Sequence, residues 1–183
     1  MDQIAQKSQL AKGTLYLYFQ SKEEVFLELK EREYALWFQE MGKFLGTISG
    51  TLSVEEKKTK FVKQVVQSFE KKQDRLRLIA SLHHLLERNI SLEKIMEFNR
   101  KIGASILEVG SLLEEKFPFL KKGDGAFLLL AIKSIAIGLN HTSEIAPVLK
   151  TQKVTPPEFL ALQVPFSKSF ERLLTLLLAG FSS

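Results

Sequence analysis

Apolar side chains recur every three or four residues along almost the whole chain, and no window alternates between apolar and polar residues as a half-buried strand does. Serines followed by acidic residues mark probable helix starts at Ser21, Ser53 and Ser91, because a serine hydroxyl can accept a hydrogen bond from the first helical turn. The pattern predicts an all-α protein.

Glycines and prolines indicate where the predicted helices end. A long helix is expected to start at Ser21 and to end where Gly42, Gly46 and Gly50 accumulate. The helix from Ser53 should fade into a charged stretch, with a turn near Asp74 that caps the next helix. Further helices are predicted from Ser91 to just before Pro118, from Asp124 to about Thr142, and, after Pro147, Pro156 and Pro157, to about Gly180.

The final helix carries an apolar stripe that is wide for one small domain to cover. It consists of Phe170, Leu173, Leu174, Leu177, Leu178 and Phe181. The preceding helix has small residues on neighbouring turns, at Ala131, Ser134 and Gly138, where another helix could approach closely. We therefore predict a homodimer that joins the last two helices of each copy in a four-helix interface; the alternative is that the stripe serves an intramolecular core.

Composition limits the possible classes of protein. With 183 residues, 45% of them hydrophobic, the chain can bury one core, or one core and a small appendage. It has no Cys, which excludes disulfides and thiolate metal sites and favours a cytoplasmic location. The start of the chain does not resemble a secretory signal. The longest apolar stretch, from Ala126 to Gly138, contains Lys133 and is shorter than the roughly 20 residues that cross a bilayer, so no membrane association is expected.

Charge and candidate chemistry add little by themselves. The net charge of +5 suits a polyanionic partner such as DNA but does not establish one. The chain has only three His, and the adjacent pair His83 and His84 lacks the i, i+4 spacing of a helical zinc site. No glycine-rich phosphate loop is present either. We predict no enzyme, no metal and no cofactor; catalysis lost on substitution of His83 or His84 would revive the enzyme alternative.

The segment from Ile4 to Phe26 has the pattern of two short helices followed by a long one. Its apolar residues have the spacing of buried contacts: Ile4, Ala5, Leu10, Leu15 and Phe19. The residues expected on the outward side are Lys12, Gly13, Thr14, Tyr16 and Tyr18. A cation, a bare backbone, a hydroxyl and two phenols are suitable groups for base edges and phosphate oxygens.

Several elements of this segment occur in a characteristic order: Ile4-Ala5, then Lys12-Gly13-Thr14-Leu15-Tyr16, Tyr18-Phe19 and Ser21-Lys22-Glu23-Glu24. In this order and spacing the segment resembles the helix-turn-helix of the TetR family of transcription regulators. The resemblance implies that Lys12, Gly13 and Tyr16 face base edges in the major groove. It also implies that Thr14, Tyr18 and Lys22 hold phosphates, Lys22 with help from the positive end of the helix that Ser21 caps. Gln3 is a weaker candidate.

The resemblance implies an organisation for the rest of the chain. Residues 1–45 would form the DNA-binding region with its connecting long helix, and residues 46–183 a ligand-binding and dimerisation domain. The expected activity is that of a repressor that binds double-stranded operator DNA. A small effector would release it by favouring a state in which the two DNA-binding regions of the dimer are wrongly spaced for the two half-sites of the operator. The helix from Ser21 to Lys43 would transmit that change.

The chain departs from the family pattern in two ways. Gln9 and Ala11 stand where the family usually has Gly in the turn and Ser or Thr before Lys12-Gly13, which adds strain and removes a helix cap. The helix that precedes this segment in the family is not in the sequence, so Leu15, Phe19 and Val25 are expected to lose part of their cover. Weak or absent specific DNA binding is the expectation; the alternative function is a helical dimer that binds a small molecule and no DNA.

Polar residues on otherwise apolar helices are the candidates for effector contact. They are His83, His84, Asn99, Asn140 and His141, with Trp37 as a possible wall. A His near an apolar face is more often an ordinary core or surface residue than a ligand-binding one. The abundance of Phe and Leu favours a small apolar or amphipathic effector.

Overall fold

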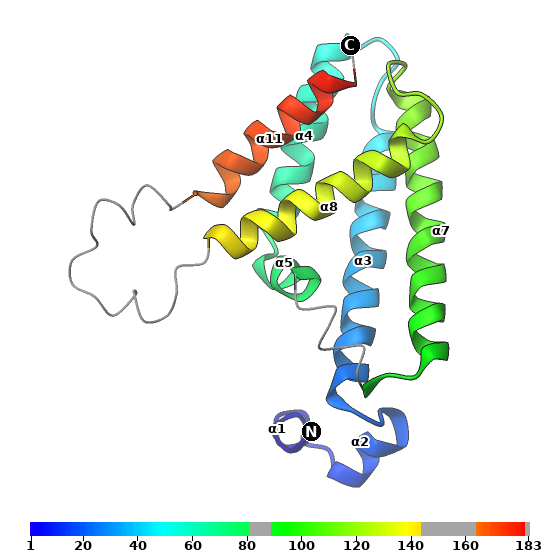
Figure 1. Cartoon of the computed structure of the whole chain (residues 1–183), viewed down its shortest axis with the longest axis vertical. Helices are drawn as coiled ribbons and strands as arrows, with labels where there is room; N and C mark the ends of the chain where they lie inside the picture. The colour runs from blue at the N-terminus through cyan, green and yellow to red at the C-terminus, as the bar shows by residue number, and fades with distance from the viewer. Residues whose placement is uncertain (81–88, 144–163, 182–183) are drawn as a thin grey trace, which may run out of the picture.

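The structure is a computed structural model that describes residues 1–80, 89–143 and 164–181. This part of the chain forms eight helices and no strand, which confirms the all-α prediction (Figure 1). The helices are α1 (Asp2–Ser8), α2 (Lys12–Tyr18), α3 (Lys22–Gly46), α4 (Val54–Glu70), α5 (Gln73–Ala80), α7 (Leu92–Lys116), α8 (Asp124–Ser143) and α11 (Phe166–Gly180).

The predicted helix starts are confirmed in detail. The hydroxyls of Ser21, Ser53 and Ser91 each accept a hydrogen bond from the backbone N–H three residues later. Ser53 and Glu56 form a complete capping box, because the carboxylate of Glu56 also accepts from the Ser53 N–H. The predicted turn near Asp74 is displaced: the break lies at 71–72, between α4 and α5, and Asp74 is in the first turn of α5 rather than at its cap.

The core lies where α3, α4, α7, α8 and α11 meet. In Figure 1, α3 and α7 run side by side, α8 crosses in front of α3, and α11 lies along α4. The side chains at the centre are fully buried, among them Met41, Leu45, Val65, Leu113, Ile132 and Phe170. Phe69 of α4 meets Phe170 of α11 edge to face at 5.6 Å, and such ring pairs add to the gain from burial.

The backbones of helices α7 and α8 come close together at two glycines, Gly110 and Gly125. A Cβ atom added to Gly125 would overlap the carbonyl oxygen of Gly110, and one added to Gly110 would lie 2.8 Å from the Ala126 nitrogen. Glu114 of α7 binds the start of α8, since its carboxylate accepts from the N–H groups of Gly123 and Gly125 at 2.8 and 3.0 Å. The crossing therefore requires glycine on both sides.

The apolar helix α8 is, by length and composition, capable of crossing a membrane. One face of the helix packs against α7, α5 and α11, and Leu128, Ile132 and Ala136 are completely or almost completely buried there. Other apolar residues of α8, such as Phe127 and Leu130, are exposed.

A buried arginine joins α5 to α3. The Arg75 guanidinium has no exposed surface and donates to Glu40 at 2.7 and 3.0 Å and to Glu33 at 3.0 Å. Lys72 also donates to Glu40, at 2.8 Å. The Arg75 hydrogen bonds, opposed by burial and helped by Lys72, lower the pKa of Glu40 to about 2. The charged stretch that was predicted to be a turn therefore contributes a buried ion-pair network.

Candidate nucleic-acid interface

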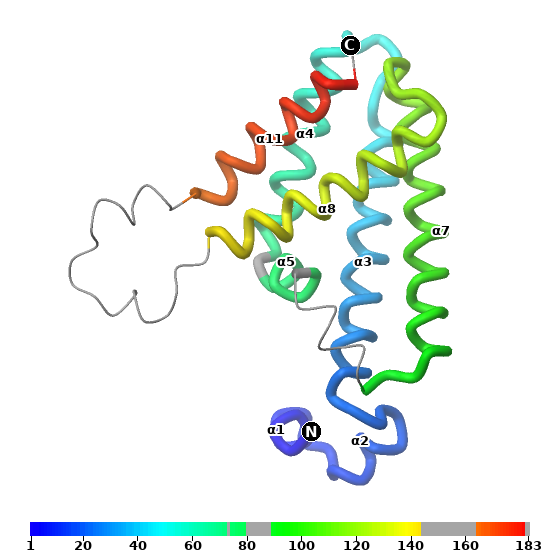
Figure 2. The backbone as a smooth tube through the Cα atoms, in the orientation of Figure 1, coloured from blue at the N-terminus to red at the C-terminus, as the bar shows by residue number. Residues whose placement is uncertain are grey.

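Helices α1 and α2 form a small unit at one end of α3 (Figure 2). The turn between them passes through Gln9, whose φ of 57° is left-handed, as its place in the turn predicted. Ala11 is the N-cap of α2 and provides no side-chain hydrogen bond, which is the second weakness expected from the sequence. The α1–α2 unit is thus built, but with fewer local supports than the family pattern supplies.

Four of the five apolar residues predicted to join the two helices do so. Ala5 and Leu15 are buried, and Ile4 and Phe19 are half-buried. Leu15 is buried, contrary to the expectation that it loses part of its cover, whereas Phe19 and Val25 are only half-buried. Leu10 is different, because its side chain is 48% exposed in the turn between the helices. The prediction that Leu10 is a buried contact was wrong: its N–H bonds back to the Ala5 carbonyl, but its side chain stays at the surface.

The six residues predicted to contact DNA lie together on α2 and the first residue of α3. Five of the six are exposed: Lys12, Gly13, Tyr16, Tyr18 and Lys22. Thr14 is half-buried. Tyr16 and Tyr18 expose 46% and 72% of their surface, so both phenols can reach a partner. The surface around Gly13 is open, because nothing lies within 4 Å of the position of a Cβ atom there.

Lys12 is paired with an acid of α1. Its ammonium lies 2.7 Å from the carboxylate of Asp2, and both side chains are mostly exposed. This hydrogen bond raises the pKa of Lys12 and lowers that of Asp2. Because an ammonium has three donors, Lys12 can keep Asp2 and still donate to a nucleic acid.

The turn between α2 and α3 is fixed by contacts of Ser21 and Glu24 with residues that are distant in the chain. The carboxylate of Glu24 accepts from the Gln20 N–H at 2.8 Å, one residue before the position expected for a capping box, and from the Lys94 ammonium at 2.7 Å. The Ser21 hydroxyl donates to the Asn89 carbonyl at 3.0 Å. Lys94 and Asn89 are about 70 residues away in the chain, so local sequence patterns could not reveal these contacts.

The candidate effector residues have different environments. Trp37 is buried, and its indole N–H donates to the Ser68 hydroxyl at 2.9 Å. Asn140 is buried on α8, whereas Asn99 on α7 and His141 on α8 are exposed. His83 and His84 lie outside the described residues. The effector site therefore stays a prediction.

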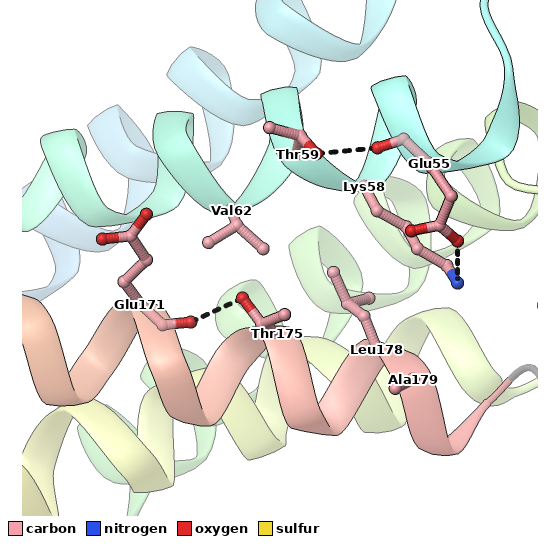
Figure 3. A pocket seen from close by; sticks show the side chains of 8 residues that line it. All are labelled: Glu55, Lys58, Thr59, Val62, Glu171, Thr175, Leu178 and Ala179. Carbon is pink, nitrogen blue, oxygen red and sulfur yellow. Dashed lines mark hydrogen bonds and ion pairs between the residues drawn. The ribbon is translucent and has the colours of Figure 1, made fainter.

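A groove of about 270 Å³ lies between α4 and α11 (Figure 3). Val62 and Leu178 line its apolar part. The hydroxyls of Thr59 and Thr175 donate to carbonyls of their own helices, and Lys58 is held by Glu55 at 2.8 Å and lies over the ring of Phe119. Since these polar groups are already bonded within the protein, the groove is a weaker ligand site than its size suggests.

An exposed, DNA-compatible helix at the end of a long helix, followed by an all-helical domain, defines a helix-turn-helix transcription regulator. Comparison with family models gives two matches. Residues 1–29 match the model of bacterial regulatory proteins of the tetR family, and residues 31–183 match the tetracyclin repressor-like C-terminal domain. A search of curated proteins finds no match. The chain belongs to the TetR family and is a DNA-binding transcription regulator.

Proposed function

We propose that the protein is a repressor that binds operator DNA as a homodimer through α2 and is released by a small effector. The observation that carries the DNA-binding part is the surface formed by Lys12, Gly13, Tyr16 and Tyr18 on α2, next to Lys22 at the positive end of α3. Lys12, Gly13 and Tyr16 would contact base edges. Thr14, Tyr18 and Lys22 would contact phosphates.

Residues 1–45 would serve as the DNA-binding region, and residues 46–183 as the effector-binding and dimerisation domain in the cytoplasm. The effector would be small and apolar or amphipathic, in keeping with the rings and aliphatic side chains of the core. The effector would bind one arrangement of the two DNA-binding regions more tightly than the other, and this difference in affinity would release the protein from the operator.

The DNA-binding proposal predicts a change in salt dependence when Lys22 is replaced. Lys22→Ala should reduce the slope of log affinity against log salt by about 1, because one phosphate contact is lost. The measurement is fluorescence anisotropy with a labelled duplex at several salt concentrations. Lys63→Ala is the matched control, since Lys63 is exposed on α4 and its loss changes the net charge equally. Equal slopes for the two variants would remove Lys22 from the interface.

Half of the apolar stripe predicted on the last helix serves the intramolecular core instead, because Phe170, Leu174 and Leu178 are buried. The dimer proposal rests on a different apolar face, which α8 and α11 leave exposed. Phe127 and Leu130 on α8 and Leu173 and Leu176 on α11 are between 39% and 59% exposed. Ser134 and Gly138, also exposed, are small enough for a second helix to approach α8. Two such faces related by a two-fold axis would form a four-helix interface.

Leu176→Glu should convert the dimer into a monomer, because two charges would be buried at the interface without partners. Sedimentation velocity over a range of protein concentrations measures the outcome. Met96→Glu is the control, since Met96 is 63% exposed on α7, away from the proposed interface. A Leu176→Glu variant that stays as dimeric as the Met96→Glu variant would place the interface elsewhere.

A further inference from the structure

Residues at and just before the start of α7 contact the turn between α2 and α3, next to the α1–α2 unit. Two hydrogen bonds make the connection, from the Ser21 hydroxyl to the Asn89 carbonyl and from the Lys94 ammonium to Glu24. The same Glu24 oxygen accepts the Gln20 N–H of the turn. One carboxylate oxygen of Glu24 thus binds both Lys94, at the start of α7, and the backbone of Gln20, just after α2.

Burial makes Glu24 dependent on these partners. The Glu24 side chain is 3% exposed, whereas Lys94 is 43% exposed. Burial by itself would raise the pKa of Glu24, but the hydrogen bonds from Lys94 and Gln20 outweigh it, so that the pKa is lowered and the carboxylate is ionised near neutral pH. Without the Lys94 ammonium, the buried charge would lose its only cationic partner among the described ion pairs, and its hold on the turn would weaken.

A second ion pair between the same two helices provides a comparison. Lys101, two turns further along α7, lies 2.7 Å from Glu31 of α3 and 3.0 Å from Glu97 of its own helix. It also links α7 to α3, but it does not touch the turn after α2. A comparison of Lys94 with Lys101 therefore distinguishes a contact that acts on α2 from a general attachment of α7 to α3.

We propose that Glu24 and Lys94 are positioning residues: the ion pair between them holds the turn that follows α2 and thereby sets the orientation of α2. This inference rests on the proposed DNA-binding role of α2. Besides the covalent connection through α3, the Glu24–Lys94 pair is a direct contact between the two matched regions of the chain.

The test compares Lys94→Gln with Lys101→Gln. Hydrogen exchange in the free protein should become about tenfold faster for the amides from Lys12 to Ser21 in Lys94→Gln, because a charged hydrogen bond that restrains the turn is lost. Lys101→Gln should leave these amides unchanged. Lys94→Arg, which keeps the charge and the donors, should restore slow exchange. In DNA-binding assays with a duplex enriched from a random pool, Lys94→Gln should bind about tenfold more weakly than Lys101→Gln.

Equal exchange in the two glutamine variants would overturn the proposal and leave Lys94 as one of several attachments between α3 and α7. Faster exchange with unchanged DNA affinity would also overturn it, because the turn would then not control the reading helix. If the wild-type chain binds no duplex at all, the DNA-binding assay contradicts the proposed function. The hydrogen-exchange measurement still decides whether Lys94 restrains the turn, so the two failures can be told apart.

Discussion

Arg75→Met should lower the free energy of unfolding by about 2–3 kcal/mol, because Glu33 and Glu40 lose the charged hydrogen bonds of a buried cation, while Glu40 keeps Lys72. Methionine fills much of the arginine volume, so the loss comes from these hydrogen bonds more than from a cavity. Urea unfolding followed by circular dichroism measures it. Arg77→Met is the control, since Arg77 is 67% exposed and lies 4.0 Å from Asp74. Such a surface pair contributes at most about 1 kcal/mol.

The same network predicts a dependence on pH. The pKa of Glu40 is lowered in the folded protein from 4.5 to about 2. A group with a depressed folded pKa contributes stability above its unfolded value, and that contribution is lost as the pH falls from about 4.5 towards 2. The wild-type chain should lose stability over this range more steeply than Arg75→Met. Parallel curves would show that the pairing of Arg75 with Glu40 does not lower the pKa of Glu40.

Gly125→Ala should destabilise the protein by about 3 kcal/mol, because the new methyl group would meet the Gly110 carbonyl, a backbone atom that can move only if α7 and α8 separate. The measurement is thermal or urea unfolding. Gly103→Ala is the control in the middle of α7, where nothing lies within 4 Å of the added Cβ. That variant should be stabilised by up to about 1 kcal/mol, since alanine favours a helix over glycine. The two substitutions must differ in sign; a neutral Gly125→Ala would mean that the helices do not cross this closely.

Local signals predicted much of the fold. The starts of α3, α4 and α7 follow from a serine and the residues of the next helical turn. These cap contacts are local, so they form regardless of what the helix packs against. The left-handed Gln9 and the uncapped Ala11 were also predictable from their positions in a helix-turn-helix. The motif likewise placed Lys12, Tyr16, Tyr18 and their neighbours in one outward-facing group.

What the sequence did not reveal depends on residues distant in the chain. Arg75 lies among lysines and acids, a composition typical of a solvated turn, and only the approach of α3 buries it. Glu24 reads as part of a capping box, yet it binds Lys94 from the other domain. The contact of Gly110 with Gly125 likewise exists only where two helices cross.

The central claim is that α2 and the start of α3 read double-stranded DNA. The most direct measurement is fluorescence-anisotropy binding of the wild-type chain to a duplex that it has enriched from a random pool, against a scrambled duplex of the same length, at low and moderate salt. We expect about tenfold or stronger preference for the enriched duplex at low salt, with affinity falling steeply as salt rises. Equal binding to both duplexes, or no enrichment over the random pool, would contradict the claim and favour a helical dimer that binds a small molecule and no DNA.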